Sequence, residues 1–251
     1  MYLKVPAEMA EFALRESRTS EVMVYLATQF YFSGKAKTEP NPVKYLSNYL
    51  PLKKRAIYKH FNWLQQRNWI GKNESLGWYH FRGFNAVHNI EAWTFSRAVK
   101  MKSSDLQHIK PFLMAAFIIS LVKTWKRGKE TERKERRSEQ LFYPVSHSAL
   151  SKLLNISIST VKRYLKAAES LGYIKIEENL IKVTNMTKLD KRLINKTGLT
   201  SINVELLGYS DERIVPIDRI RFKDGSLYIQ DPNIIYPLLE LKSRRGLSKY
   251  R

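Results

Sequence analysis

The sequence VSHSALSKLLNISISTVKRYLKAAESLGYIKIE, residues Val145–Glu177, decides the fold of this chain. Its apolar residues recur at helical spacing, pause over the short turn Ile156–Ser159, and then recur at helical spacing again. After Gly172 the pattern becomes that of a strand. The segment therefore predicts a short helix, a tight turn, a second helix and a strand, in that order.

The residues at the ends of these elements fit the same assignment. Ser146 is a suitable N-cap for a first helix that runs to about Asn155. Ser159 opens the second helix, Ser159–Leu171, and is a candidate for its N-cap. The sequence then predicts a wing of two strands around a turn at Glu177–Asn179, namely Tyr173–Ile176 and Leu180–Thr184.

An earlier segment, Tyr45–Lys72, repeats the apolar pattern of Ala149–Ile176 without a gap. The matching pairs are Leu46 with Leu150, Tyr49 with Leu153, Leu50 with Leu154, Leu52 with Ile156, Ile57 with Val161, Phe61 with Leu165, Leu64 with Ala168, Trp69 with Tyr173 and Ile70 with Ile174. Each copy predicts a helix, a turn, a basic helix and a strand, which is the order of a winged helix-turn-helix. The repeat therefore predicts two such units in tandem.

The first unit is predicted to begin with a helix over Ser20–Gly34, capped by Ser20. A polar loop, Lys35–Pro42, follows it, and Pro42 suits the first turn of the next helix. The remaining predicted elements of this unit are helices over Val43–Leu50 and Lys53–Asn68 and strands over Trp69–Lys72 and Gly77–Phe81.

The rest of the chain gives weaker patterns. Asn85–Asp105 is predicted to be a connector, and Lys110–Trp125 a helix that is apolar almost all round. The charged block Lys126–Glu139 predicts either a solvated extension or a basic arm along DNA. Towards the C-terminus we expect a hairpin of Arg219–Phe222 and Ser226–Ile229 around a turn at Asp224-Gly225. A closing helix over Ile234–Lys242 and a basic tail, Ser243–Arg251, should follow it.

These patterns predict an α+β fold that is mainly α with small β-hairpins. Its expected parts are two winged helix-turn-helix domains and a small C-terminal α/β appendage. The predicted boundaries are 1–84 for the first domain, 85–109 for a connector, 110–184 for the second domain and 185–251 for the appendage.

The charge of the chain indicates its partner. Its 251 residues include 44 Lys and Arg against 23 Asp and Glu, a formal net charge of +21. Such an excess favours a polyanion, because each neutralised phosphate releases condensed counterions. The chain has no cysteine and shows neither an export signal nor a membrane helix. We therefore expect a soluble cytoplasmic protein that binds nucleic acid and not membranes.

The candidate DNA contacts lie on the second helix of each copy and on the second wing. In the second copy Val161, Leu165 and Ala168 must face the core, which leaves a hydroxyl-rich and basic face open to the major groove. In the first copy Ile57, Phe61 and Leu64 form the buried stripe. The predicted contacts are Lys53, Lys54, Arg55, Tyr58, Lys59, Asn62, Ser159, Thr160, Lys162, Arg163, Lys166, Lys175 and Lys182.

Two features of the wings qualify this prediction. Glu177 and Glu178 at the expected tip of the second wing would repel phosphate, so Lys175 and Lys182 are the better contacts there. In the first wing, Trp78, Tyr79, Phe81 and Arg82 form an aromatic and basic mixture. Such residues stack on sugars or unpaired bases, or they belong to the core. For Trp78 and Phe81 the core is the default interpretation.

The second copy resembles the winged helix-turn-helix of bacterial regulators of the GntR and MarR types. In those families a small residue and a leucine seat the first helix, a serine or threonine pair opens the recognition helix, and a Leu-Gly-Tyr/Leu-Ile sequence leads into the wing. The matching residues here are Ala149, Leu150, Ser159, Thr160, Leu171, Gly172, Tyr173 and Ile174. The resemblance implies the fold and DNA binding, and a tandem pair is also the architecture of plasmid replication initiators.

Several functions remain open on this basis. The first is a sequence-specific double-stranded DNA-binding protein that acts as a transcription regulator of a bacterium or mobile element. The second is a plasmid or phage replication initiator. The others are a non-specific RNA-binding or nucleoid-coating protein, and a scaffold that binds a protein or itself through Asp211–Lys242.

An enzyme is not expected from these residues. The five histidines form no His-x-His or His-Glu-x-x-His motif, and no glycine-rich phosphate loop or spaced carboxylate set is present. The sequence thus predicts neither catalytic residues nor a bound metal or cofactor.

Overall fold

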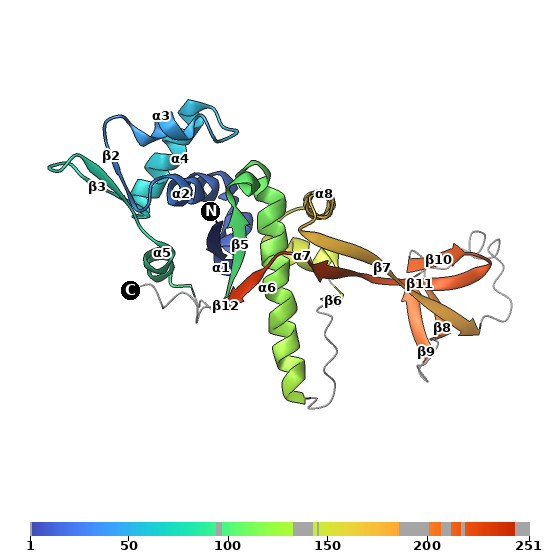
Figure 1. The fold of residues 1–251 in the computed structure, drawn as a ribbon. Helices are drawn as coiled ribbons and strands as arrows, with labels where there is room; N and C mark the ends of the chain where they lie inside the picture. The colour runs from blue at the N-terminus through green and yellow to red at the C-terminus, as the bar shows by residue number, and fades with distance from the viewer. Residues whose placement is uncertain are drawn as a thin grey trace.

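The computed structural model describes residues 2–93, 97–132, 143–144, 146–185, 201–206, 212–216 and 219–243. It has the mixed α+β composition that the sequence predicts, with antiparallel sheets beside packed helices. A long central helix, α6, separates one group of helices from another (Figure 1). Among the described residues, no helix combines the length and the apolar character that a membrane crossing requires.

The first predicted unit contains its expected helices and strands and one more strand. The elements are α2 (Thr19–Tyr31), β2 (Lys35–Lys37), α3 (Pro42–Leu46), α4 (Lys54–Gln66), β3 (Ile70–Asn73) and β4 (Trp78–Phe81). The segment predicted as the loop Lys35–Pro42 supplies β2, which pairs with β4 and gives the sheet order β2-β4-β3. The predicted cap Ser20 is wrong, because α2 begins at Thr19 after Arg18.

Local sequence explains how α3 and α4 form. Asn41 caps α3, since its side chain accepts a hydrogen bond from the Val43 amide at 2.9 Å, and Pro42 occupies the first turn as predicted. This helix ends at Leu46, earlier than the sequence predicts. Helix α4 buries the predicted stripe of Ile57, Phe61 and Leu64, and it packs on α2, α3 and β3.

The second predicted unit also combines helices with short strands, and one of its strands comes from much later in the chain. Its elements are α6 (Ile109–Glu132), β6 (Tyr143–Pro144), α7 (His147–Leu154), α8 (Ile158–Ser170), β7 (Ile174–Asn185) and β11 (Ser226–Pro237). Strand β11 pairs antiparallel with both β6 and β7. The order β6-β11-β7 therefore corresponds to β2-β4-β3 in the first unit.

This pairing corrects the predicted wing. Glu177–Asn179 is not a turn, because β7 runs through it as one continuous strand. The return strand is β11, whose Ile234 lies opposite Glu177 and whose Asp231 lies opposite Asn179. The predicted helix Ile234–Lys242 is also wrong, since these residues end β11 and begin β12 (Leu241–Ser243). A short apolar run fits a buried strand as well as a helix, so its spacing alone did not distinguish them.

The predicted hairpin at Asp224-Gly225 is confirmed. Strand β10 (Ile220–Lys223) pairs with β11 so that Lys223 lies opposite Ser226. Asp224 and Gly225 both have positive φ, 49° and 72°, as the two central residues of a type I′ turn require. Two further strands, β8 (Ser201–Leu206) and β9 (Glu212–Pro216), extend the same sheet in the order β10-β11-β7-β8-β9. Figure 1 shows β7 and β11 carrying these strands away from α6.

A third sheet joins a strand near the N-terminus, a strand of the predicted connector and a strand late in the chain. The elements are β1 (Tyr2–Pro6), α1 (Ala7–Arg15), α5 (Phe84–Ile90), β5 (Arg97–Lys102) and the short 3-10 helix η1 (Ser103–His108). Strand β5 lies between β1 and β12 and pairs antiparallel with both. The segment Asn85–Asp105, for which the sequence predicts only a connector, thus supplies most of α5 and the central strand of this sheet.

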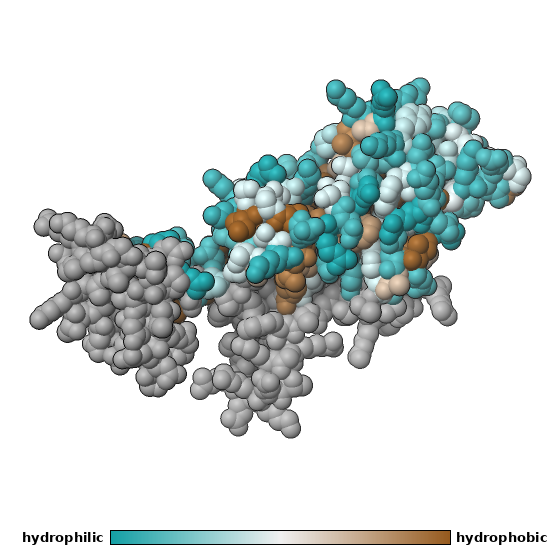
Figure 2. Space-filling model, turned by 180° about the vertical axis from the view of Figure 1, so that it is seen from behind, coloured by the Kyte–Doolittle hydropathy of each residue, from teal (hydrophilic) through white to brown (hydrophobic). Residues whose placement is uncertain are grey.

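One apolar core runs through both predicted units. It includes Leu46 and Phe61 from the first unit and Leu150 and Leu165 from the second. Helix α1 packs on α6 and α7, and α6 packs on α8, so these helices join the two groups. The described surface is mostly hydrophilic when seen from behind, with hydrophobic residues in small separate patches (Figure 2). The units are thus built on a shared interior, and the domain boundaries predicted above stay predictions.

Some predictions fall wholly or partly outside the described residues. The predicted helix Lys110–Trp125 lies within α6, which continues into the charged block as far as Glu132. The rest of that block up to Glu139 is outside the described residues, as is the predicted basic tail beyond Ser243.

Candidate nucleic-acid interface

Helix α8 begins with a cluster of hydroxyl groups. Ser157 is its N-cap, and the Ser157 Oγ accepts a hydrogen bond from the Thr160 amide at 3.2 Å. The same oxygen lies 2.9 Å from both Ser159 Oγ and Thr160 Oγ1. The predicted cap Ser159 is therefore wrong, because a helix that starts at Ile158 needs its capping acceptor one position earlier.

The two faces of α8 differ in the way the sequence predicts. Val161, Leu165 and Ala168 are buried on the face toward α6 and α7. The candidate contacts lie on the other side: Ser159, Lys162, Arg163 and Lys166 are exposed, and Thr160 is half-buried. The guanidinium of Arg163 lies 5.5 Å from the ring centre of Tyr164. The open face of α8 thus offers three cations and two hydroxyl groups within its first three turns.

Helix α7 adds one titratable group close to this face. His147 opens α7, and burial lowers the pKa of its imidazole, with a further contribution from the charge of Lys162. Its imidazole therefore stays neutral at neutral pH and adds no charge to the surface. Helix α7 itself is capped by Ser146, whose Oγ accepts from the Ala149 amide at 3.0 Å, and this confirms the predicted cap.

Helix α4 presents a second basic face. All six of its candidate contacts are exposed, namely Lys53, Lys54, Arg55, Tyr58, Lys59 and Asn62. The ammonium of Lys54 lies 6.0 Å from the centre of the Tyr58 ring. His60 does not belong to this surface, because its Nδ1 lies 3.3 Å from Oε1 of the buried Glu21 on α2.

The two candidate contacts on β7 have different surroundings. Lys175 forms an ion pair with Glu177, which raises the pKa of its ammonium, and its ammonium lies 5.7 Å from the Tyr236 ring centre. Its charge is therefore partly neutralised within the strand pair. Lys182 is exposed farther along β7, opposite Tyr228 of β11.

Two exposed apolar residues beside the turn were not among the predicted contacts. Ile158, the first residue of α8, is 45% exposed, and Leu153 of α7 is 52% exposed. Apolar side chains at the start of a recognition helix contact the thymine methyl group in the major groove. Sequence spacing gave no sign of them, since both fit the apolar periodicity of their helices.

The first wing separates its aromatic residues between two faces. Tyr79 and Phe81 are buried, and their rings lie 5.1 Å and 6.3 Å from that of Phe61 on α4. Trp78 points to the other face, where the Lys35 ammonium lies 5.3 Å from its ring centre. The core interpretation of Phe81 is thus confirmed, and Trp78 is only half-buried.

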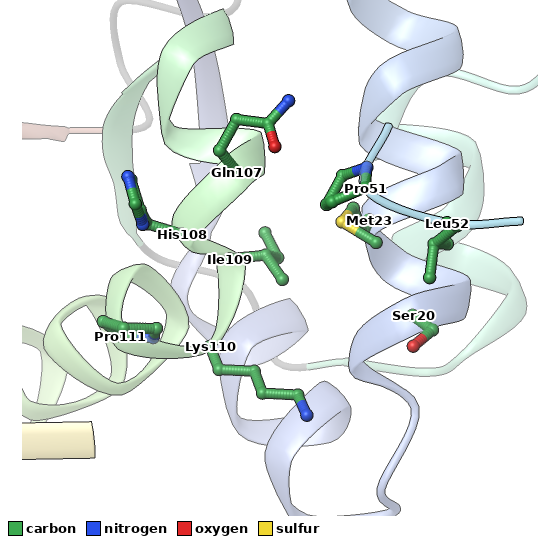
Figure 3. Close-up of a pocket in the computed structure, with 9 residues that line it drawn as sticks. All are labelled: Ser20, Met23, Pro51, Leu52, Gln107, His108, Ile109, Lys110 and Pro111. Atoms are coloured by element: carbon green, nitrogen blue, oxygen red, sulfur yellow. The ribbon is translucent and has the colours of Figure 1, made fainter. Parts of the chain in front are cut away.

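A cavity of about 290 Å³ lies beside the turn that precedes α4. Pro51 and Leu52 of that turn, Met23 of α2 and Ile109 at the start of α6 line it. Figure 3 shows Ile109 pointing toward Met23 and Pro51 across the space. Ser20, Gln107, His108 and Lys110 line it as well, so the lining mixes apolar and polar side chains. Among the described residues, no group of His, Asp and Glu side chains is arranged to hold a metal ion.

Comparison with known proteins identifies one part of this surface. Residues 144–175 match the family described as winged helix-turn-helix DNA-binding. The matched segment includes α7, α8 and the first two residues of β7. No curated protein and no solved structure matches the chain. Residues 144–175 are therefore a winged helix-turn-helix DNA-binding segment, with α8 as its second helix.

Proposed function

We propose that this chain is a sequence-specific double-stranded DNA-binding protein that acts by binding alone. The observation that carries the proposal is the open face of α8, where Ser159, Thr160, Lys162 and Arg163 surround the N-terminal half of the helix. This half enters the major groove in helix-turn-helix proteins. Arg163 reads guanine through paired hydrogen bonds, and the hydroxyl groups contact bases or phosphates.

A second recognition helix, α4, is part of the same proposal. The strand order β2-β4-β3 around α3 and α4 corresponds to β6-β11-β7 around α7 and α8, which supports two winged helices in tandem. The exposed Lys53, Lys54 and Arg55 at the start of α4 supply phosphate and base contacts. When one unit is bound, the shared core holds the other at high effective concentration over adjacent DNA.

Selection of bound duplexes from a random library tests this proposal directly. Two recognition helices that engage together select a site with two conserved blocks separated by a fixed spacing. A selected site with only one conserved block would show that a single unit reads DNA. Recovery of unrelated sequences, with random duplex or structured RNA competing as well as selected duplex, would overturn sequence-specific binding.

The biological role that we propose is transcription regulation in a bacterium or mobile element. A replication initiator is the second candidate, and the observation that favours it is the pair of similar units on one continuous core in a single chain. Footprinting on a supercoiled plasmid separates the two roles. Protection of a promoter without melting supports regulation, whereas local melting beside the bound site supports initiation.

A further inference from the structure

The outward face of the sheet β2-β4-β3 carries an aromatic ring among basic side chains. The register places Lys37 opposite Trp78 and Lys35 opposite His80. Residues two apart on a strand share a face, so Lys35, Lys37, Trp78 and His80 all lie on the same side of the sheet. We name these four residues the wing platform. Lys35, Lys37 and His80 are exposed.

The wing platform faces away from the proposed recognition helix α4. The alternate residues Tyr79 and Phe81 are buried on the opposite side of β4 and contact Phe61 of α4. A duplex that binds the open face of α4 therefore lies on the other side of this unit from the wing platform. The wing platform is therefore left accessible to a nucleic-acid strand that is not part of that duplex.

Trp78 lies at the centre of the wing platform beneath two lysine side chains. The ammonium groups of Lys35 and Lys37 lie 5.3 Å and 6.0 Å from its ring centre. A lysine reaches this position with a flexible four-carbon side chain, so its ammonium can move aside while the ring stays fixed. The cation–π contact holds the indole in place at the surface, where its ring is half-buried.

The neighbouring strand leaves the platform open on one side. Gly71 of β3 lies opposite His80, so no side chain covers the sheet there. Glu74, the acidic residue in the loop between β3 and β4, forms an ion pair with Lys72, with 3.0 Å between Oε1 and Nζ. The face is thus basic, and no β3 side chain covers it beside the imidazole, whereas Asn73 lies opposite Trp78.

We propose that the wing platform binds single-stranded nucleic acid by stacking an unpaired base on Trp78. The base takes the place of the ammonium groups on the indole, and Lys35 and Lys37 then pair with the flanking phosphates. An aromatic ring among lysines provides this combination in single-strand binding proteins, because every base has a face that stacks. A duplex cannot use the same surface in this way, since its bases are stacked on each other.

The test measures binding of the full chain to a labelled oligothymidylate of about 12 nucleotides, within the site size of such surfaces. Trp78→Leu removes the ring, and we expect about tenfold or greater loss of affinity for the oligothymidylate. Trp78→Phe keeps a stacking ring and should retain most of the affinity. Stacking also quenches Trp78 fluorescence, so the difference signal between wild type and Trp78→Phe should fall on addition of the oligothymidylate.

A second variant tests the wing platform while keeping Trp78, so the test does not depend on whether Trp78→Leu folds normally. An added Cβ at Gly71 would meet only His80 atoms at 4.0 Å, so Gly71→Val fits the fold while it covers the open side of the platform. We expect it to weaken oligothymidylate binding as well. Lys223→Ala is the control, because it removes an exposed cation from the hairpin of β10 and β11, outside the wing platform, and should leave that affinity unchanged.

Three results would overturn the proposal: unchanged oligothymidylate affinity in both Trp78→Leu and Gly71→Val, an equal loss in Lys223→Ala, or no change in the Trp78 signal. The outcome is separable from the proposed duplex reading. Arg163→Ala should weaken duplex binding and leave the oligothymidylate unaffected, and Trp78→Leu should do the reverse.

Discussion

At the scale of single residues, the N-cap of α8 decides which hydroxyl groups are available to DNA. Ser157 satisfies the Thr160 amide, so Ser159 is left outside the capping hydrogen bond. Both serines are exposed and lie two residues apart, and sequence preference alone favours neither. Their roles nevertheless differ, because one belongs to the stability of the helix and the other to its open surface.

The serine assignment predicts different effects of two similar substitutions. Ser157→Ala should lower stability by about 0.5–2 kcal/mol, because it leaves the Thr160 amide without its acceptor. Ser159→Ala is the matched control and should change stability far less. Thermal unfolding followed by circular dichroism compares the two variants. An equal loss in both would contradict the assigned cap.

Arg163 and Lys54 are predicted to contribute differently to DNA binding. Arg163→Ala should cost about 1–3 kcal/mol on a selected site and relax preference at one position, as the loss of a base contact does. Lys54→Ala should weaken binding to all duplexes and flatten the dependence of log affinity on log salt by about one unit. Titrations of selected and random duplexes at several salt concentrations measure both effects.

The control for this pair is Lys223→Ala, which removes an exposed cation from the hairpin of β10 and β11. It should leave preference at every base position unchanged. If Arg163→Ala and Lys54→Ala act equally on selected and random duplexes, the proposed division between base and phosphate contacts fails.

At the scale of elements, Glu91 joins the end of α4 to α5 and the start of β3. Its carboxylate accepts two hydrogen bonds from the Arg67 guanidinium, at 2.7 Å and 2.6 Å, and one from the Trp69 indole at 2.7 Å. Burial alone would raise the pKa of Glu91, but the hydrogen bonds from Arg67 and Trp69 and the charge of Arg67 outweigh burial and hold the pKa below its ordinary value. The ionised form therefore stabilises this junction.

The lowered pKa of Glu91 predicts a specific loss of stability in acid. A carboxyl group whose pKa is lower in the folded state stabilises the fold above its ordinary pKa, and this contribution disappears as the pH falls through the folded value. Glu91→Gln should therefore be less stable than wild type near pH 7, and the difference should shrink as the pH falls toward about 3. Unfolding free energies across this range measure it.

Glu178→Gln is the control for the acid experiment, because Glu178 is exposed on β7, outside the junction of Glu91 with Arg67 and Trp69. Its difference from wild type should stay small at every pH. A Glu91→Gln deficit that does not diminish in acid would show that the carboxylate charge is not what holds this junction.

At the scale of the whole molecule, the strand β11 connects the C-terminal sheet to the DNA-binding segment. Its Ile235 is buried in the common core and pairs with Tyr143 of β6 and Ile176 of β7. The chain between β7 and β11 is therefore an insertion into the second wing, and the wing itself depends on residues after the insertion.

This topology predicts opposite results for two shortened chains. A chain that ends at Asn185 loses β11, leaves β6 and β7 without their partner, and should unfold at a markedly lower temperature with weak DNA binding. A chain in which an Asn-Gly turn joins Lys182 directly to Tyr228 keeps the pairing, because these residues lie opposite each other. It should retain thermal stability and duplex binding. A truncated chain as stable as wild type would refute the role of β11.

The sequence by itself determined the local architecture around both turns. The buried stripes of α4 and α8 follow from apolar spacing along one helix, and the turn at Asp224-Gly225 follows from residues that adopt positive φ. Exposure of most candidate contacts on α4 and α8 follows from the same periodicity, because a helix that buries one stripe leaves the other side to solvent. These features depend on neighbours a few residues apart.

Only the tertiary structure decided which strands pair and which face of a strand is outward. Strand β11 reaches β6 and β7, and β1 and β12 reach β5, across long separations in sequence. Hydrogen bonds between strands connect backbone groups, which are alike in every residue, so the sequence carries little record of the partner. The position of Trp78 among Lys35 and Lys37 depends on such a pairing, of β2 with β4, and became visible only in the folded chain.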